Sequence, residues 1–371
     1  MLKIIIIGAL PSSLINFRGE LIKSFVENDH KVITMASGAT AAEIDSIESL
    51  GAKYIDYSVQ RNGLNPIADL KTFFKLRKIF KAEKADLILA YTIKPVIWGG
   101  IAARLSTNAK FYGLVTGLGF AFQKSSLKRN LLSWAVSWLY RQALSKASGT
   151  IFQNPDNLKT FTDKGIINTD KAHRVNGSGV DLEYFSKSNL PIYPLVFLTV
   201  ARLLGEKGLR EYSQAARQVI KKYPDVVFNI VGPEDPSPDG IPLKEVNAWH
   251  KVGDIQYLGG KEDVRPFINE CHVFVLASYH EGMPRTVLEA MAIGRPILTT
   301  NVPGCRETVI SGENGFLVDK MNVEQLIDKM TWFIENQKQL PTMANKSHEF
   351  AKERYDVHKV NHELMKIMEL K

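Results

Sequence analysis

Short apolar runs alternate with helix-like segments along this chain, and the alternating series occurs twice. The first series of apolar runs covers residues 4–7, 31–35, 52–57, 86–90, 109–115, 149–153 and 173–175. The second series covers residues 195–201, 226–231, 256–257, 273–276 and 296–300. Runs of this kind form buried parallel strands, and the segments between them supply the crossover helices that parallel strands need. The pattern therefore predicts an α/β fold with two parallel sheets.

The length and the composition between the two series predict two domains. A chain of 371 residues is long enough for two hydrophobic cores. Residues 176–185 contain two glycines and residues 187–194 contain two prolines, a composition typical of a linker. We predict an N-terminal Rossmann-like domain over residues 1–186 and a C-terminal one over residues 187–355, with a cleft between their strand ends.

Helices are predicted near residues 19–27, 41–50 and 67–81, and again over 323–336, 341–354 and 357–369. The first eight residues are too short for a signal peptide and are typical of a first strand. The sequence contains no run of 18 apolar residues, so we predict no transmembrane helix. Two cysteines cannot form a disulfide framework, which fits a reducing compartment. The sequence contains no Asp-x-Asp motif and its histidines form no ligand-spaced cluster, so we expect no metal site, and we predict no cofactor.

The charge of the chain is uneven. Its formal net charge is +8 at pH 7. Residues 1–190 carry 25 Lys and Arg against 15 Asp and Glu, whereas residues 191–371 carry 22 against 24. A basic first half indicates an anionic partner, either nucleic acid or an anionic membrane surface. No nucleic-acid motif accompanies the charge, so we do not expect nucleic acid as the partner.

Residues 278–289 form the motif with the most chemical content, with the sequence Ser-Tyr-His-Glu-Gly-Met-Pro-Arg-Thr-Val-Leu-Glu. They follow the apolar run 272–277, so a strand is predicted to end, a tight turn to follow, and a helix to begin and to end at Gly294. In an open α/β sheet, ligands bind outside the carboxyl ends of the strands. The motif is therefore a candidate ligand site.

The two glutamates of this motif, Glu281 and Glu289, suit a hydroxyl-rich anionic ligand. Amide groups at the helix start would face an anion such as a diphosphate. The two carboxylates would stand on either side of it and accept hydrogen bonds from sugar hydroxyls. The alternative is that Glu281 caps the helix and Glu289 is a solvated helix residue.

A second motif supplies cations. Arg202 and Lys207 follow the predicted strand 196–201, in a loop that also contains Gly205 and Gly208. Two cations at a strand end, in a loop that contains glycine, are suited to binding a diphosphate. The alternative is that both are solvated surface residues.

The string from residue 276 to residue 297 resembles the signature of glycosyltransferase family 4, whose members are retaining, nucleotide-sugar-dependent enzymes of the GT-B fold. The resemblance covers nearly the whole chain and is strongest over residues 196–320. It implies two Rossmann-like domains, of which the first binds the acceptor and the second binds the nucleotide sugar. It also implies a last helix, about 356–371, that returns to the first domain.

The resemblance assigns roles to individual residues. It implies Glu281, Arg202 and Lys207 as catalytic residues, with no protein nucleophile and no metal. It implies a donor site in which Glu289 binds the ribose and the loop 256–264 binds the base through its backbone. The remaining donor-site residues are Gly282, Met283, Pro284, Arg285, Thr286, Glu262, Asp263 and Val264.

The first domain is expected to supply the acceptor side. Asn16 and Arg18 lie in what the pattern indicates is a loop after the first strand, and Gly117 and Gly119 allow close approach of backbone to a ligand. Many family members carry a histidine in the loop after the strand 86–90. The matching position here is Ile93, so we predict that the neighbouring Lys94 contacts the sugar or a phosphate instead.

The membrane hypothesis rests on two basic segments. Residues 124–146 contain five cations, no acid, and Trp134 and Trp138. Residues 61–84 contain seven cations against two acids. Basic, aromatic helices bind at membrane interfaces. The alternative for the tryptophans, which are four residues apart, is a place in the core.

The combined interpretation is a hexosyltransferase that moves a sugar from a UDP-sugar to a polyprenyl-diphosphate-linked saccharide. Within the family it resembles the enzymes that add N-acetylgalactosamine to undecaprenyl-diphosphate-linked diacetylbacillosamine. It would act as a peripheral protein at the cytoplasmic face of the inner membrane, in bacterial glycan assembly. The alternatives are a sugar-nucleotide 2-epimerase of the same fold and a non-catalytic subunit that binds a sugar nucleotide.

Overall fold

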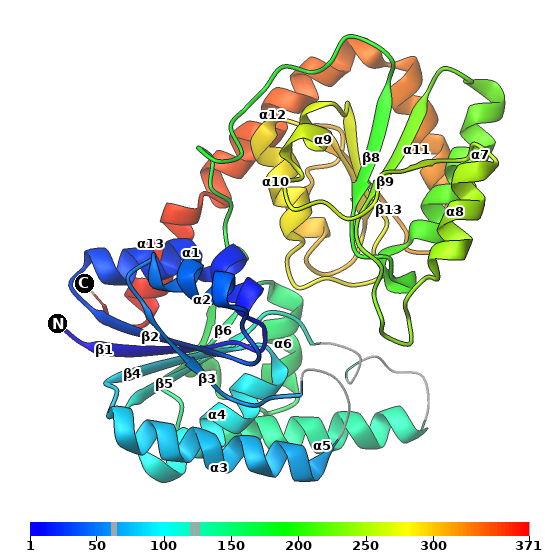
Figure 1. The fold of residues 1–371 in the computed structure, drawn as a ribbon. Coiled ribbons are helices and arrows are strands. Elements are labelled where there is room, and N and C mark those ends of the chain that lie inside the picture. Colours follow the sequence, from blue (N-terminus) through cyan, green and yellow to red (C-terminus); the bar gives the residue numbers. More distant parts are fainter. Residues whose placement is uncertain (61–64, 119–121, 123–126, 371) are drawn as a thin grey trace. The chain divides into compact units, whose positions relative to one another are not determined.

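The computed structural model describes residues 1–60, 65–118, 122 and 127–370, with the backbone alone for residues 127–129. The chain divides into two compact units (Figure 1). Unit 1 comprises Met1–Ser178 with His358–Lys371, and unit 2 comprises Gly179–Val357. Residues 179–186, which we predicted in the first domain, thus lie in unit 2, where Phe185 is buried in a hydrophobic cluster. None of the described helices combines the length and the apolar character that crossing a membrane requires.

Unit 1 contains a seven-stranded parallel sheet in the order β3-β2-β1-β4-β5-β6-β7. Its elements are β1 (Lys3–Ile7), α1 (Pro11–Glu27), β2 (Lys31–Ala36), α2 (Ala41–Glu48), β3 (Lys53–Asp56), α3 (Pro66–Glu83), β4 (Leu87–Tyr91), α4 (Ile93–Ser106), β5 (Lys110–Val115), α5 (Leu127–Leu144), β6 (Gly149–Phe152), α6 (Pro155–Asp163), β7 (Ala172–Arg174) and α13 (Val357–Ile367).

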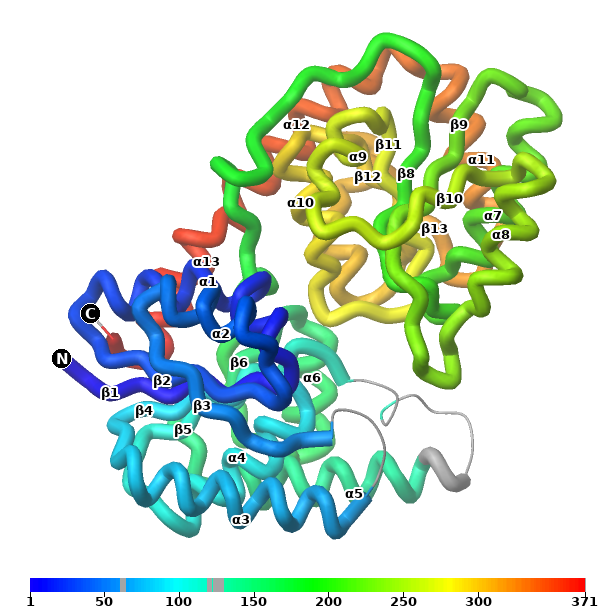
Figure 2. Tube along the Cα trace, viewed as in Figure 1, coloured from blue at the N-terminus to red at the C-terminus, as the bar shows by residue number. Residues whose placement is uncertain are grey.

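Helices cover both faces of this sheet, because the side chains of a strand alternate between the faces. Ile5 and Ile7 of β1 join the cluster formed with α3, α4 and α5. Ile4 and Ile6 join the cluster formed with α1, α2 and α13. Figures 1 and 2 show these two helical layers on opposite sides of the sheet. The last helix therefore completes the core of unit 1.

Unit 2 contains a six-stranded parallel sheet in the order β10-β9-β8-β11-β12-β13. Its elements are β8 (Val196–Val200), α7 (Leu209–Lys222), β9 (Val227–Val231), α8 (Leu243–Lys251), β10 (Gln256–Tyr257), α9 (Arg265–Asn269), β11 (Val273–Leu276), α10 (Arg285–Ile293), β12 (Ile297–Thr300), β13 (Gly315–Val318), α11 (Val323–Glu335) and α12 (Leu340–Arg354). The two parallel sheets with their covering helices confirm the predicted fold class.

One helix boundary was predicted wrongly. The first helix begins at Pro11 and not near residue 19, so Asn16 and Arg18 lie within α1 and not in a loop. Proline is favoured at the first position of a helix because its fixed φ suits the helix and its missing N–H costs nothing there. Leu14 and Leu21 are buried on the same face, which anchors the added turns against the sheet.

Candidate active site at the carboxyl edge of the second sheet

The strand order of unit 2 places a topological switch point between β8 and β11. From β8 the chain continues to β9 on one side, and from β11 it continues to β12 on the other side. The loops that leave β8 and β11 therefore diverge at the carboxyl edge of the sheet, which is where open α/β sheets bind ligands. The two sequence motifs lie in these two loops.

The loop after β8 is held tightly against the loop after β11. Gly208 ends a short 3₁₀ turn, Gly205–Lys207, and begins α7 with φ +68°. A Cβ at Gly208 would lie 2.1 Å from the carbonyl oxygen of Ala277. The amide of Tyr279 donates to the carbonyl of Glu206 at 2.9 Å. Only glycine fits here, and the close approach brings the side chains of the two loops together.

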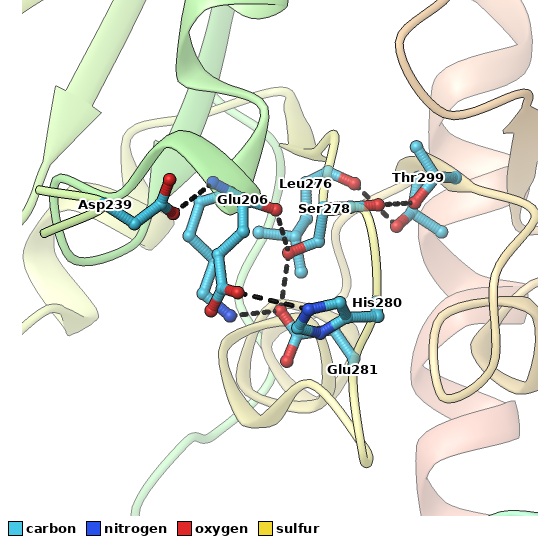
Figure 3. Close-up of polar contacts among 9 residues, drawn as sticks. Glu206, Asp239, Leu276, Ser278, His280, Glu281 and Thr299 are labelled. Atoms are coloured by element: carbon cyan, nitrogen blue, oxygen red, sulfur yellow. Dashed lines mark hydrogen bonds and ion pairs between the residues drawn. The ribbon is translucent and has the colours of Figure 1, made fainter. Parts of the chain in front are cut away.

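Lys207 and Glu281 form an ion pair at this junction. Lys207 Nζ donates to Glu281 Oε1 at 2.5 Å. Ser278 Oγ donates to the same oxygen at 2.7 Å, a contact that Figure 3 shows. The side chains of the pair are only 16% and 15% exposed. Burial acts to lower the pKa of Lys207, but the charge of Glu281 and its hydrogen bond outweigh burial and raise that pKa. The ammonium is therefore held in its charged form.

A second charged pair lies beside the first. His280 Nε2 lies 3.1 Å from Glu206 Oε2 (Figure 3). Contact with the Glu206 carboxylate raises the pKa of His280, although burial opposes it, and the His280 imidazole lowers the pKa of Glu206. The amide of Glu206 also donates to Asp239 Oδ2 at 2.9 Å. Sequence analysis missed Glu206, Ser278 and His280, although all three stand beside the predicted residues in the two motifs.

The helix start matches the prediction, with one chemical correction. α10 runs from Arg285 to Ile293 and ends at Gly294 with φ +88°. Its N-cap is Pro284, with no side-chain cap, so the alternative role of Glu281 as helix cap is wrong. Pro284 has no amide hydrogen and cannot donate to an anion. The other predicted amide donors stay candidates: Gly282 and Met283 before the helix, and Arg285 and Thr286 in its first turn.

Glu289 is buried on α10. Only 6% of its surface is exposed, and Arg285 Nε donates to its Oε1 at 2.8 Å. Burial raises the pKa of Glu289, and Arg285 opposes that rise. The alternative that Glu289 is a solvated helix residue is therefore wrong. A buried carboxylate with a single cationic partner retains acceptor capacity for a ligand.

Arg202 and the predicted base loop have partners of their own. Arg202 Nη1 is bound to Asp235 Oδ2, and the Arg202 side chain is 42% exposed. Asp263 accepts three hydrogen bonds from Arg265, from the backbone amide at 3.0 Å, from Nε at 2.9 Å and from Nη2 at 2.7 Å. Glu262 is exposed and Val264 precedes α9. A pocket of about 230 Å³ adjoins Asp263 and Arg265.

The predicted acceptor-side residues of unit 1 differ from one another in exposure and in their partners. Asn16 is exposed, whereas Arg18 is 2% exposed and lies over the ring of Tyr91 at 5.1 Å. Lys94 Nζ donates to Asp69 Oδ1 at 2.8 Å in a largely buried ion pair. Gly117 follows β5, and Gly119 lies outside the described residues.

Within the described residues, no group of three or more His, Cys, Asp or Glu side chains could hold a metal ion.

Comparison with known proteins identifies the family. The family described as "Glycosyl transferases group 1" matches residues 181–354, and "Glycosyl transferase 4-like" matches residues 14–154. The chain is a glycosyltransferase. It belongs to the hexosyltransferases, and its two units correspond to the GT-B fold.

Two curated relatives of this glycosyltransferase span most of its length. It is 29% identical to the N,N′-diacetylbacillosaminyl-diphospho-undecaprenol alpha-1,3-N-acetylgalactosaminyltransferase of Campylobacter jejuni, over 88% of each chain. It is 28% identical to the UDP-Gal:alpha-D-GlcNAc-diphosphoundecaprenol alpha-1,3-galactosyltransferase of Escherichia coli, over 75% of each chain.

Solved structures share its fold. Anabaena Alr3699/HepE in complex with UDP-glucose matches with a TM-score of 0.81 and 19% identity, over 100% of each chain. Sucrose-phosphate synthase from Thermosynechococcus elongatus matches with a TM-score of 0.82 and 17% identity, over 100% of this chain and 98% of that one.

Proposed function

We propose that this glycosyltransferase moves an N-acetylhexosamine, such as N-acetylgalactosamine, from a UDP-sugar to a polyprenyl-diphosphate-linked saccharide with retention of configuration. The observation that carries the proposal is the Lys207–Glu281 pair at the switch point of the second sheet, beside the N-terminus of α10. The names of both relatives support the acceptor class, because each specifies a diphosphoundecaprenol-linked substrate. The UDP-glucose complex of the Anabaena protein supports a UDP-sugar donor.

Lys207 and Arg202 would bind the diphosphate of the donor. Each cation now has a carboxylate partner, Glu281 and Asp235 respectively. A diphosphate that enters the loop would bind the two cations beside these carboxylates or in their place. The negative charge that develops on the leaving group would then be stabilised by cations that are already positioned. Glu281, released from part of its charge pairing, would accept a hydrogen bond from a hydroxyl of the transferred sugar.

Glu289 would bind the ribose hydroxyls, and the backbone of residues 262–264 would bind the base. Under the retaining mechanism, the leaving phosphate takes the proton of the attacking acceptor hydroxyl on the same face of the sugar. The protein then supplies position and charge stabilisation and no nucleophile. Asn16, Arg18, Lys94 and the glycine loop after β5 are proposed on the acceptor side, with unit 1 as the acceptor-binding domain and unit 2 as the donor-binding domain.

The proposal places the enzyme as a peripheral protein at the cytoplasmic face of the inner membrane, because a polyprenyl-linked acceptor is anchored in lipid. The role in the cell would be a step of bacterial glycan assembly.

The test is a transfer assay with UDP-N-acetylgalactosamine, UDP-N-acetylglucosamine, UDP-galactose, UDP-glucose and GDP-mannose, with and without a diphosphoprenol-linked N-acetylhexosamine. Mass spectrometry should detect one added sugar from one UDP-sugar, and NMR should show the same anomeric configuration in product and donor. Lys207→Met should abolish transfer, whereas Lys251→Met, an exposed lysine of the same unit, should not. An inverted product, or a donor epimerised in the absence of acceptor, would overturn the proposal.

A further inference from the structure

The outer face of the α3–α4–α5 layer is unusually apolar. Of the sixteen large apolar side chains that are exposed in the described part of the chain, seven lie on these three helices. They are Ile67 (70% exposed), Leu70 (51%), Phe74 (56%), Leu105 (52%), Leu131 (69%), Trp134 (65%) and Trp138 (48%). The structure thus excludes the core alternative for Trp134 and Trp138, and it leaves this surface without a partner in the described chain.

The exposed side chains share one face, because each lies opposite the buried side of its helix. On α3 the buried positions are Asp69, Thr72, Leu76 and Phe80, and on α5 they include Val136 and Tyr140. The exposed apolar residues recur at spacings of three and four on the other side of each helix.

The middle helix, α4, joins the two outer helices into one surface. It packs against both α3 and α5, and the layer lies on one side of the sheet (Figures 1 and 2). Its exposed apolar residue is Leu105, whereas Trp98 and Ile101 are partly buried and pack against the core. We call the outward surface of α3, α4 and α5 the apolar-basic face.

The charge on this face has one sign. Lys71, Lys78 and Lys81 are exposed on the same side of α3 as Ile67, Leu70 and Phe74. The two acids of α3 are both paired: Asp69 with Lys94, and Glu83 with Lys3 and Lys53. The sequence from residue 87 to residue 155 contains no Asp or Glu, so α4 and α5 have none.

We propose that the apolar-basic face docks on the surface of a bilayer that contains anionic lipid, with the tryptophans and the other exposed apolar side chains inserted among the headgroups. Tryptophan and apolar residues flanked by lysine are typical of helices that lie in the membrane interface. Lysines near an anionic bilayer add favourable electrostatic energy, and they extend their apolar stems along the surface while the charge reaches the headgroups. This inference deepens the proposed function, which already requires a lipid-anchored acceptor.

Two other occupants fit the face less well. Protein–protein interfaces are depleted of lysine, whereas this face has three exposed lysines on one helix. A symmetric dimer through the face would bring the lysines of two copies close together, and like charges repel. An anionic bilayer satisfies both the apolar and the cationic side chains.

The test is co-sedimentation of the full chain with vesicles of phosphatidylcholine alone and with vesicles of equal parts phosphatidylcholine and phosphatidylglycerol. The wild type should bind the anionic vesicles and should shift its tryptophan emission to shorter wavelength. The triple variant Leu131→Ser, Trp134→Ser, Trp138→Ser and the double variant Lys78→Glu, Lys81→Glu should each lose about tenfold or more in vesicle partitioning. All five positions are outside the core, so both variants should fold.

Matched controls lie in unit 2. The variant Ile192→Ser, Val252→Ser, Met321→Ser removes three apolar side chains that are 98%, 67% and 60% exposed. The variant Lys244→Glu, Lys251→Glu reverses the charge of two exposed lysines. Both should bind vesicles as the wild type does. Equal losses in the controls, or no preference of the wild type for anionic vesicles, would overturn the inference. So would a change from dimer to monomer in the α5 variant with vesicle binding intact, since the face would then be a self-association surface.

A soluble transfer assay separates this inference from the proposed function. With a short-chain, water-soluble prenyl acceptor, the α5 variant should transfer sugar as the wild type does while it fails to bind vesicles. Vesicle binding that is unaffected by the variants, together with normal transfer, would refute the docking face alone. Absence of transfer to any acceptor by the wild type would refute the proposed function, whatever the vesicles show.

Discussion

At the scale of the residue, the Lys207–Glu281 pair is the feature that joins stability to function. Both side chains are largely withdrawn from water, so neither charge is satisfied by solvent. Such a pair is costly to break, because removal of one partner leaves the other charge buried and unpaired. The ammonium of Lys207 is also positioned to bind a diphosphate, because the ligand can replace the carboxylate of Glu281 beside it.

The first prediction is a double-mutant cycle on this pair. Lys207→Met or Glu281→Gln alone should lower the free energy of unfolding by about 3 kcal/mol, and the double variant should lose clearly less than the sum. Urea unfolding monitored by circular dichroism measures all four proteins. Additive losses would show that the two side chains are not coupled in solution.

The second prediction concerns pH and the His280–Glu206 pair. The pKa of His280 is raised above 6.5, so its contribution to stability is fully present below pH 6.5 and is lost as the pH rises through the raised value. The pKa of Glu206 is lowered below 4.5, so its contribution is present above pH 4.5 and is lost as the pH falls through the lowered value. Stability from the pair should therefore be greatest between these limits.

His280→Gln should remove the loss of stability that occurs as the pH rises through the pKa of His280. We expect the difference in melting temperature between wild type and variant to be largest near pH 6 and to shrink at higher pH. His362→Gln, which replaces an exposed histidine of unit 1, is the control and should keep the wild-type profile. A constant difference across the range would argue against the charged pair.

At the scale of the element, the site depends on how two strand-to-loop junctions fit together. Gly208 permits the loop after β8 to approach the carbonyl of Ala277 at the end of β11. Gly253, in the same unit, has a similar positive φ of +83°. A Cβ at Gly253 would meet no non-neighbouring atom of the described residues within 4 Å, so this glycine provides a natural comparison.

The third prediction uses that comparison. Gly253→Ala should cost about 1 kcal/mol, since only the positive φ is strained. Gly208→Ala should cost at least about 3 kcal/mol and should impair donor binding, because the added methyl group must displace backbone of the neighbouring loop. Thermal unfolding of the two variants measures the difference, and equal losses would show that the loops are not in close contact.

The sequence predicted elements better than it predicted contacts. The strand 273–276 and the helix that ends at Gly294 are confirmed, because burial and glycine punctuation are local signals. The pairing of Arg202 with Asp235 and of Glu206 with His280 was not predicted, because each contact joins residues that are distant in the chain. Such contacts depend on the packing of whole loops.

Helical spacing did not decide whether Trp134 and Trp138 lie in the core, whereas their exposure in the structure does. Trp134 and Trp138 are four residues apart, a spacing that places them on one side of a helix without telling whether that side faces the core or the surroundings. In the structure Val136 and Tyr140 occupy the core side, and the tryptophans are exposed. The start of α1 was missed because its first residues, Pro11, Ser12 and Ser13, are also typical of turns.

At the scale of the whole molecule, the two units repeat one plan. In each sheet the strand order changes side next to the first strand, between β1 and β4 in unit 1 and between β8 and β11 in unit 2. The edge in unit 2 carries the Lys207–Glu281 pair and the buried Glu289, whereas the edge in unit 1 carries Tyr91 with Arg18 over its ring and the Lys94–Asp69 pair. Both edges thus carry a charged pair, and the buried carboxylate of Glu289 is the feature behind the proposal that unit 2 binds the donor.

The most direct test of that central claim is calorimetric titration of UDP into the wild type, Glu289→Gln and Lys251→Met. We predict that the wild type binds UDP, that Glu289→Gln weakens binding about tenfold or more because the ribose loses a charged acceptor, and that Lys251→Met binds as the wild type does. Glu289→Gln should also be at least as stable as the wild type, since burial disfavours the carboxylate charge. Absence of UDP binding, or equal affinity in Glu289→Gln, would contradict a nucleotide-sugar site at this edge.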